Sequence, residues 1–330
     1  MPRISRILAA AAAGIFLAAL QAYAQTDAIT ANKKINRGTI TEMSTAEVTL
    51  DMAGVARKFP VNEIAKIAFG EEPIDLTAAR NSVDQKNYNS ARDQLDKIDV
   101  SKVEKDYIKQ DIAFYKAYCL SKLALTEGGN KGDAAKAMFA VFKAYPSNYH
   151  FYEMAEVLGD LGVATANFAA AADYYGDKGL GSAPWPEYKL RAGLAMGRAL
   201  VLAGKYDEAG KAFDAVTASG ENNAEAAAFK QHAAVGKALC LGSTGKADEG
   251  ITALNEIVAK NDPQLDGKLF ARAYNALGNC YLEQKKPKDA LMAFLKTDLL
   301  FFSDADAHAE ALSKLAKLWD ETGHSDRATD

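Results

Sequence analysis

The chain has 330 residues, of which 49% are hydrophobic and 25% charged, values typical of a globular protein rather than a disordered one. Its 39 Lys and Arg against 43 Asp and Glu give a formal net charge of −4. Binding to nucleic acid needs Lys and Arg concentrated against phosphate, so this balance excludes nucleic acid as the expected partner.

Residues 1–24 have the features of a cleavable signal peptide. Arg3 and Arg6 precede an uncharged apolar run, Ile7–Leu20, and Ala22–Ala24 forms an A-x-A cleavage site. The run is shorter than the roughly 20 apolar residues that span a bilayer, and no cysteine follows it to carry a lipid. We therefore expect a periplasmic or secreted bacterial protein without a stable membrane anchor, whose net charge after cleavage is −6.

Residues 27–70 are predicted to form a small β module. Ala53 and Gly54 mark a turn, and Gly38 a bulge or bend. The predicted strands are short runs rich in β-branched and aromatic residues: Thr39–Thr41, Val48–Leu50, Phe59–Val61 and Ile64–Phe69. Closure of such strands removes unpaired edges, so we expect a small closed barrel. The stretch resembles the SH3-like or Sm-like barrels that precede repeats in some exported bacterial proteins.

Residues 75–330 are predicted to be helical throughout, and three segments align without gaps. The segments are Ala195–Phe213, Ala276–Phe294 and Lys314–Ala328. At matched positions they carry a small residue in a first helix, an alanine in a second helix and, in two segments, a phenylalanine: Gly197, Gly278 and Ala316; Ala209, Ala290 and Ala328; Phe213 and Phe294. Small residues at these places let two antiparallel helices approach closely, and large residues fill the space around them.

This pattern resembles the tetratricopeptide repeat, a helix pair that buries its apolar face only by stacking on neighbouring pairs. Weaker copies are Asn87–Ile98, Ala134–Pro146 (matched through Ala135 and Phe139), Phe151–Gly162 and Gly245–Leu254. Small residues of the second helices are 38 to 41 residues apart, against about 34 in the family. The resemblance implies a mainly α fold, a solenoid of six or seven repeats behind the β barrel.

Searches for catalytic and metal-binding motifs find none. The sequence contains no phosphate-binding glycine loop, no GxSxG elbow and no HExxH pair among its four histidines. Cys119, Cys240 and Cys280 lie far apart on apolar stretches, which favours buried thiols over a single disulfide. We expect no enzyme, no metal site and no cofactor.

A row of polar residues is the best candidate for a binding surface. In the family, the residue after the small first-helix position faces the concave groove, and Arg198, Lys237, Asn279 and Lys317 are assigned there, with Asn275 one turn earlier. Such a row resembles the carboxylate-clamping groove of some family members and suits a carboxylate or an acidic peptide. The alternative is an ordinary solvated helix face.

Trp185 is a second candidate for partner binding. It stands between Pro184 and Pro186 in a predicted loop insertion, where a large aromatic side chain has less core to fill.

Together these features predict an exported, non-catalytic scaffold or adaptor that binds a protein or peptide through its concave groove. The alternative is a structural envelope component that assembles with itself, and a third hypothesis is an enzyme with a site between barrel and solenoid. The last predicted repeat has no room for a second helix after Ala328, which is a further hint of association with another chain or of missing residues.

Overall fold

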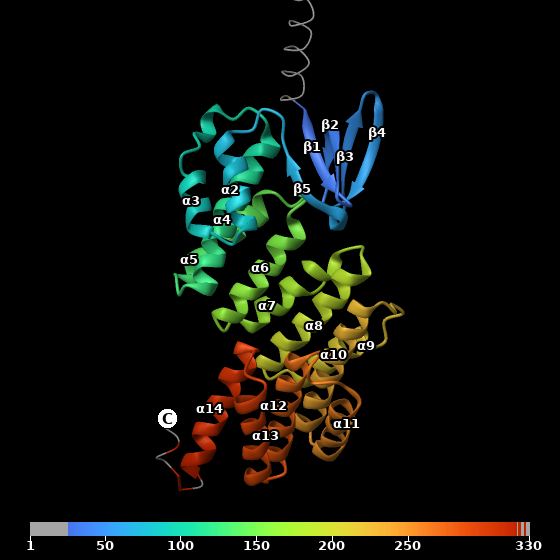
Figure 1. Ribbon diagram of the computed structural model, residues 1–330, viewed down its shortest axis with the longest axis vertical. Coiled ribbons are helices and arrows are strands. Elements are labelled where there is room, and N and C mark those ends of the chain that lie inside the picture. Colours follow the sequence, from blue (N-terminus) through green and yellow to red (C-terminus); the bar gives the residue numbers. More distant parts are fainter. Residues whose placement is uncertain (1–25, 322, 325–326, 328–330) are drawn as a thin grey trace, which may run out of the picture. The chain divides into compact units, whose positions relative to one another are not determined.

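The computed structural model describes residues 26–321, 323–324 and 327 (Figure 1). The expected signal peptide and Ala328 lie outside these residues. The chain divides into two compact units, Met1–Thr165 and Ala166–Asp330, which are described separately.

The N-terminal unit begins with a five-stranded antiparallel sheet. Its strands are β1 (Asp27–Ala31), β2 (Lys34–Met43), β3 (Glu47–Met52), β4 (Val55–Pro60) and β5 (Ile64–Ala68). They lie in the order β4-β3-β2-β1-β5, so β4 and β5 are the two edges and do not pair with each other. The expected closed barrel is therefore wrong, and the sheet is open.

Local sequence explains the tight hairpins of this sheet. Asn32 and Lys33 connect β1 to β2, and Ala53 and Gly54 connect β3 to β4, all four with positive φ as two-residue hairpins require. Gly38 is not the bulge itself, since the register shifts between Ile40 and Glu42. At Gly38 the neighbouring strand passes so closely that a Cβ atom would lie 2.1 Å from the Asp51 carbonyl oxygen.

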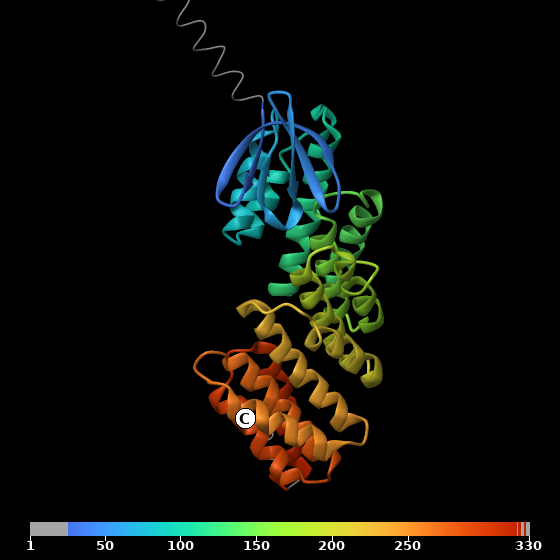
Figure 2. The ribbon, with the colours of Figure 1, turned by 90° about the vertical axis from the view of Figure 1, so that its right-hand side faces the viewer.

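The sheet does not need to close because helices cover its apolar face. The helices of this unit are α2 (Ile74–Asp84), α3 (Tyr88–Leu95), α4 (Asp106–Thr126), α5 (Lys131–Ala144) and α6 (Phe151–Ala164). The helices that share the core of the sheet are α2, α3 and α4. Ile29, Val48 and Phe59 of the sheet share one core with Leu76 of α2 and Ile112 of α4. Figure 2 shows the sheet in front of these helices. The β strands and the first helix pairs thus form one packed body.

The C-terminal unit is a series of antiparallel helix pairs. Its helices are α7 (Phe168–Tyr175), α8 (Pro186–Leu202), α9 (Tyr206–Thr217), α10 (Ala224–Ser243), α11 (Ala247–Lys260), α12 (Gly267–Glu283), α13 (Pro287–Leu300) and α14 (Ala305–Glu321). Gly197 of α8 and Gly278 of α12 each face a phenylalanine ring of the second helix, where an added Cβ would lie 2.4 Å from Phe213 and 2.6 Å from Phe294. The small residues in the aligned segments therefore make the close approach that their spacing predicts.

The turns between paired helices share one backbone conformation. Positive φ occurs at Lys86 (58°), Gly204 (72°), Gly245 (86°) and Lys285 (57°). Glycine adopts this conformation at least cost, and two of the four turns use it. The common turn shows that α2/α3, α8/α9, α10/α11 and α12/α13 are equivalent pairs.

One of the weaker sequence matches is wrong by one residue. In α5 the residues buried against the core are Ala134 and Met138, whereas the matched Phe139 is 42% exposed. Both sets have the same helical spacing, so periodicity alone does not choose between them.

A network of buried charges joins three helical layers of the N-terminal unit. Arg80 of α2 is 2% exposed. Its guanidinium lies 2.7 Å from the carboxylate of Glu72 and also contacts Asp111 of α4. Burial alone would raise the pKa of Asp111, but the Arg80 charge and hydrogen bonds from His150 and Tyr149 outweigh it and hold the pKa at about 2. The network is fully paired, which is the condition for burying charge in a protein core.

His150 completes the network and requires a proton on each ring nitrogen. Its Nε2 lies 3.2 Å from Asp111 Oδ1 and its Nδ1 2.9 Å from Glu153 Oε2, while the ring stacks on Phe114 at 3.6 Å. Carboxylates accept hydrogen bonds only, so both contacts are satisfied by the imidazolium form. Burial alone would lower the pKa of His150, but the hydrogen bonds to Asp111 and Glu153 outweigh it and raise the pKa above 6.5.

The N-terminal unit should therefore lose stability in mildly alkaline solution. Because the pKa of His150 is higher in the folded than in the unfolded state, its stabilisation is complete below pH 6.5 and is lost as pH rises through the folded value. We expect a lower midpoint of thermal unfolding at about pH 8.5 than at about pH 6, measured by circular dichroism. His150→Gln, which does not titrate, should flatten this dependence; an unchanged slope in that variant would contradict the assignment.

Other expectations concern thiols, metals and membranes. All three cysteines are buried and free, as predicted, and burial raises the pKa of Cys119 to about 12. Within the described residues, no group of His, Cys, Asp or Glu side chains has the arrangement of a metal site. None of the described helices is long and apolar enough to cross a membrane.

Candidate functional site

The polar face of the C-terminal unit is built by the first helices of its pairs. Helices α8, α10, α12 and α14 contact one another in this order. We call the surface that carries Arg198, His232 and Arg272, one residue from each of α8, α10 and α12, the first-helix face.

Arg198 is the distinctive residue of this face. It is half-buried in α8, and no hydrogen bond or ion pair to its guanidinium occurs among the described residues. Burial and, after it, the Arg272 charge lower the pKa of Arg198 to about 10, whereas Asp304 and Asp306 act in the opposite sense. The side chain therefore remains charged at neutral pH, in a place where its charge is poorly compensated.

Arg272 of α12, in contrast, is fully engaged. Its Nε and Nη2 donate to the two carboxylate oxygens of Asp304 at 2.9 and 3.1 Å. Asp304 also accepts from the backbone N–H of Ala307 at 3.1 Å and so caps α14. This pair links two consecutive repeats and leaves little of Asp304 for Arg198.

His232 lies on α10 within reach of both arginine charges. Its Nε2 is 3.1 Å from Asp266 Oδ2, while Asp266 Oδ1 caps α12 by accepting from Leu269 N–H at 2.9 Å. Burial lowers the pKa of His232, the Arg198 charge lowers it further and Asp266 opposes both. A neutral imidazole that donates Nε2–H to Asp266 leaves Nδ1 as an acceptor, and that buried atom has no hydrogen-bond partner.

Asn275 and Asn279 of α12 are bound to the last helix. The Nδ2 of Asn275 donates to Ala307 O at 2.7 Å and to Glu310 at 3.1 Å, and the Nδ2 of Asn279 donates to Glu310 at 3.0 Å. Asn275 is 2% exposed, and its buried Oδ1 has no partner. In this structure both amides hold α14 against α12.

Comparison with known proteins agrees with this repeat geometry. No family model and no curated protein matches the chain in sequence. Among solved structures, a tetratricopeptide repeat protein from Parabacteroides merdae matches with a TM-score of 0.58 at 16% identity, over 77% of this chain and 88% of that one. The chain has a tetratricopeptide-repeat fold.

Two further structures share the tetratricopeptide-repeat arrangement of this chain. The apo form of the quorum sensor NprR from B. thuringiensis matches with a TM-score of 0.51 at 10% identity, over 78% of this chain and 84% of that one. A Rap protein complexed with Competence and Sporulation Factor matches with a TM-score of 0.50 at 15% identity, over 78% and 72%. These likenesses concern the fold.

The tetratricopeptide register places Lys237 away from Arg198 and Asn279. In α10 it is Ala238, not Gly236, that faces the second helix of its own pair, because a Cβ on Gly250 would lie 2.7 Å from Ala238 O. Gly236 instead faces the Phe213 ring of the preceding pair, where an added Cβ would lie 2.4 Å from the ring. Lys237 points to that same pair and lies 2.5 Å from Asp214 of α9. The residue equivalent to Arg198 in this repeat is Leu239.

The two remaining predicted residues lie at the ends of the unit. Lys317 on α14 is exposed and has no ion pair among the described residues. Trp185 is the residue preceding α8; it is half-buried, and its ring lies 5.1 Å from that of Tyr188. Of the predicted row, the structure joins Asn275 and Asn279 through Glu310. Arg198 lies beside His232 and Arg272, which were not predicted.

His232 and Arg272 were missed, although a signal for them was present. Each lies six residues before the small position of its first helix, as Arg191 does in α8. Counting back twelve residues from the small residue of the second helix gives Gly197 and Gly278, and the same count from Gly250 gives Ala238. Strict use of this spacing would have replaced Lys237 by Leu239 in the predicted row and would have aligned His232 with Arg191 and Arg272.

Proposed function

We propose that this protein is an exported, non-catalytic adaptor that holds a protein or peptide partner against the first-helix face. The unpaired guanidinium of Arg198 carries the proposal. A half-buried charge without a partner is unfavourable, while the neighbouring Arg272 has a complete bidentate partner of its own. An anionic group on a partner would supply the negative counter-charge that Arg198 lacks.

A single carboxylate fits this position better than a polyanion. Arginine binds carboxylates through two parallel N–H···O bonds, which gives direction as well as attraction. Asp304 and Asp306 lie close enough to act on the Arg198 charge, so an extended run of negative groups would be repelled. The partner chemistry is therefore a carboxylate within a mixed or neutral peptide segment.

The structural neighbours support an interaction role of this kind. NprR is described as a quorum sensor, and the Rap protein was solved in complex with Competence and Sporulation Factor. Both have the repeat fold of this chain, in which consecutive first helices present one continuous surface.

Binding of a defined peptide tests the role of Arg198. A fluorescein-labelled peptide of alanines with one glutamate and an amidated C-terminus serves as the probe, and its glutamine counterpart as the uncharged reference. Arg198→Met should weaken binding of the glutamate peptide about ten- to hundredfold in fluorescence polarisation, because a charge-assisted hydrogen bond is lost. Lys211→Met, which removes an exposed charge from α9, is the matched control. Equal affinity of wild type for both peptides would remove Arg198 as an anchor.

Export has a separate test. Expressed in a bacterium with its natural N-terminus, the mature protein should begin at Gln25, because Ala22–Ala24 forms the cleavage site. Mass spectrometry of the envelope fraction measures this end directly, and Ala24→Tyr should abolish cleavage. Recovery of the uncleaved chain from the cytoplasm would contradict the localisation and leave the binding proposal intact.

A further inference from the structure

In the N-terminal unit, strand β2 extends beyond the last residue that pairs with its neighbour β1. β1 pairs with β2 only as far as Gly38, while β2 continues to Met43. Since β1 is the sole neighbour of β2 on that side, the segment Thr39–Met43 has no strand on the β1 side among the described residues, while its other side pairs with β3. The register shift after Ile40 re-aims this segment relative to the rest of β2.

The side chain of Asp27 replaces a strand partner only at the beginning of this segment, at Ile40. Its Oδ2 accepts the backbone N–H of Ile40 at 2.7 Å, and its Oδ1 accepts that of Gly70 at 2.7 Å. Beyond Ile40 no such substitute for a strand follows, so Thr41–Met43 is the exposed part of the β2 edge. Unpaired strand edges of this kind are templates for pairing with an added chain.

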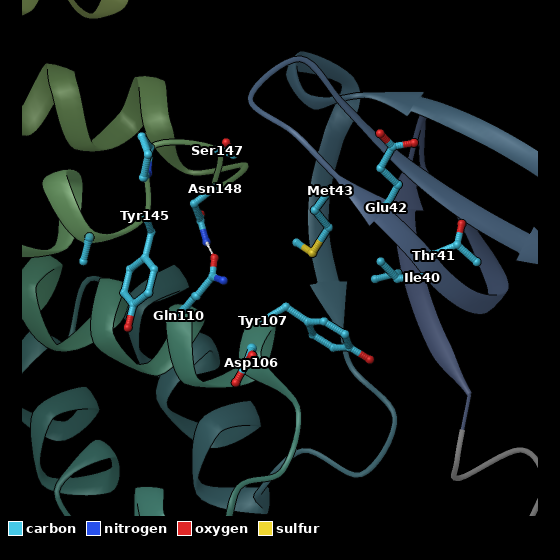
Figure 3. Close-up of a pocket in the computed structure, with 12 residues that line it drawn as sticks. Ile40, Thr41, Glu42, Met43, Asp106, Tyr107, Gln110, Tyr145, Ser147 and Asn148 are labelled. Carbon is cyan, nitrogen blue, oxygen red and sulfur yellow. Dashed lines mark hydrogen bonds between the residues drawn. The ribbon is translucent and has the colours of Figure 1, made fainter.

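A cavity of about 370 Å³ lies directly beside the open edge (Figure 3). Residues Ile40–Met43 form one wall, the start of α4 forms the floor, and residues 144–148 before α6 form the opposite wall. Figure 3 shows Met43 and Tyr107 on one side and Gln110 and Asn148 on the other. The volume is in the range of about 300–1,000 Å³ that is typical of ligand pockets.

The walls of the cavity are held in place by interactions of their own. Asn148 donates to Gln110 at 2.9 Å and accepts the His150 N–H at 2.8 Å, and the ring of Tyr107 packs 4.9 Å from that of Phe69. A ligand that enters therefore meets a preformed site and pays little ordering cost.

The charged side chains that line the cavity are acidic. Glu42 and Asp106 are the only formally charged residues that line it, and both are exposed. The cations near them have partners of their own: Lys109 contacts Asp106 at 3.4 Å in an exposed pair, and Lys58 is bound to Glu47. Lys105 lies 5.9 Å from the centre of the Tyr107 ring and contacts Glu71 at 3.5 Å. An exposed pair such as that of Lys109 is weak and exchangeable, so an incoming cation can take its place.

We propose that this edge binds an extended peptide segment that carries a lysine or arginine. The segment pairs as a strand with Thr41–Met43, so that its backbone N–H and C=O groups satisfy those of β2. A side chain packs between Met43 and Tyr107, and the basic side chain reaches Glu42 or Asp106. This surface is independent of the first-helix face and prefers partners of the opposite charge.

The experiment uses the mature full-length chain and a capped, fluorescein-labelled peptide of the order Val-Thr-Lys-Thr-Val. Fluorescence polarisation should show saturable binding below about 1 mM. Replacing the peptide lysine by glutamate should weaken binding at least fivefold, and so should the protein variant with both Glu42→Gln and Asp106→Asn. Backbone N-methylation of the peptide at its central residues should abolish binding, because it removes strand donors and leaves the protein unchanged.

Hydrogen exchange locates the contact. Protection on adding the peptide should appear at Thr41–Met43 and not at Val55–Pro60, the edge strand β4, which serves as an internal control for unspecific strand pairing. Protection at β4 alone, equal binding of the N-methylated peptide, or no binding at millimolar concentration would each overturn the proposal. None of these results depends on Arg198.

Discussion

Replacing Arg80 with methionine is expected to lower the free energy of unfolding of the N-terminal unit by about 3–5 kcal/mol. The substitution leaves Glu72 without its cationic partner and leaves only His150 to offset the charge of Asp111, whose side chain is completely buried. Methionine keeps the aliphatic part of the arginine side chain, so the loss reports mainly on the missing guanidinium charge and its hydrogen bonds.

Hydrogen exchange in urea measures this effect where it occurs. Both tryptophans, Trp185 and Trp319, lie in the C-terminal unit, so tryptophan fluorescence follows that unit and not the network. Exchange of the α2 and α4 amides should accelerate strongly in Arg80→Met at urea concentrations that leave fluorescence unchanged. Arg92→Met, which removes an exposed charge from α3, is the matched control. If both variants exchange alike, the network does not hold this unit together.

Gly197→Ala should lower the free energy of unfolding of the C-terminal unit by about 1–3 kcal/mol, against the usual trend. In an open helical position the same change stabilises by roughly 0.5–1 kcal/mol, because alanine loses less conformational freedom on folding. At Gly197 the new methyl group would lie 2.4 Å from the ring of Phe213. On its other side the ring packs against Gly236 of the next pair, where an added Cβ would also lie 2.4 Å from it, so the ring has little room to move.

Gly210 supplies the control of opposite sign within the neighbouring helix α9. A Cβ atom at Gly210 would meet nothing within 4 Å, so Gly210→Ala should stabilise the same unit. Urea unfolding followed by tryptophan fluorescence measures both variants. Adding Phe213→Leu to Gly197→Ala should recover part of the loss, because the smaller side chain vacates the contested space. Stabilisation by both alanine variants would show that the helices of this pair can separate at no cost.

The helix pairs could be predicted from the sequence because their determinants are local. Gly197 and Phe213 are sixteen residues apart, within one pair, and the same spacing recurs at Gly278 and Phe294. Buried thiols could be predicted for the same reason, since each cysteine lies on an apolar stretch of its own helix. Where the local pattern was weaker, as at Ala135 and Phe139 in α5, the prediction was displaced by one residue from the buried Ala134 and Met138.

The polar face depends on contacts between pairs, and these escaped prediction. Arg272 finds Asp304 at a separation of 32 residues, and His232 finds Asp266 at 34. One choice of register in α10 was enough to select Lys237, which lies against Asp214, instead of Leu239, the equivalent of Arg198. A side chain's partner across a repeat boundary is set by stacking, which single-repeat periodicity does not encode.

By itself the sequence determined that this protein has a tetratricopeptide-repeat fold behind a short β segment, because the spacing of small and aromatic residues within a helix pair is a local property. Only the tertiary structure decided that the sheet stays open, since helices α2 to α4 cover the face that closure would have buried. It also decided which charges are paired and which are not. Arg80 lies in a complete network and Arg198 does not, although each is an arginine that directly follows the small residue of a first helix. The difference lies in the residues that neighbouring pairs bring to them.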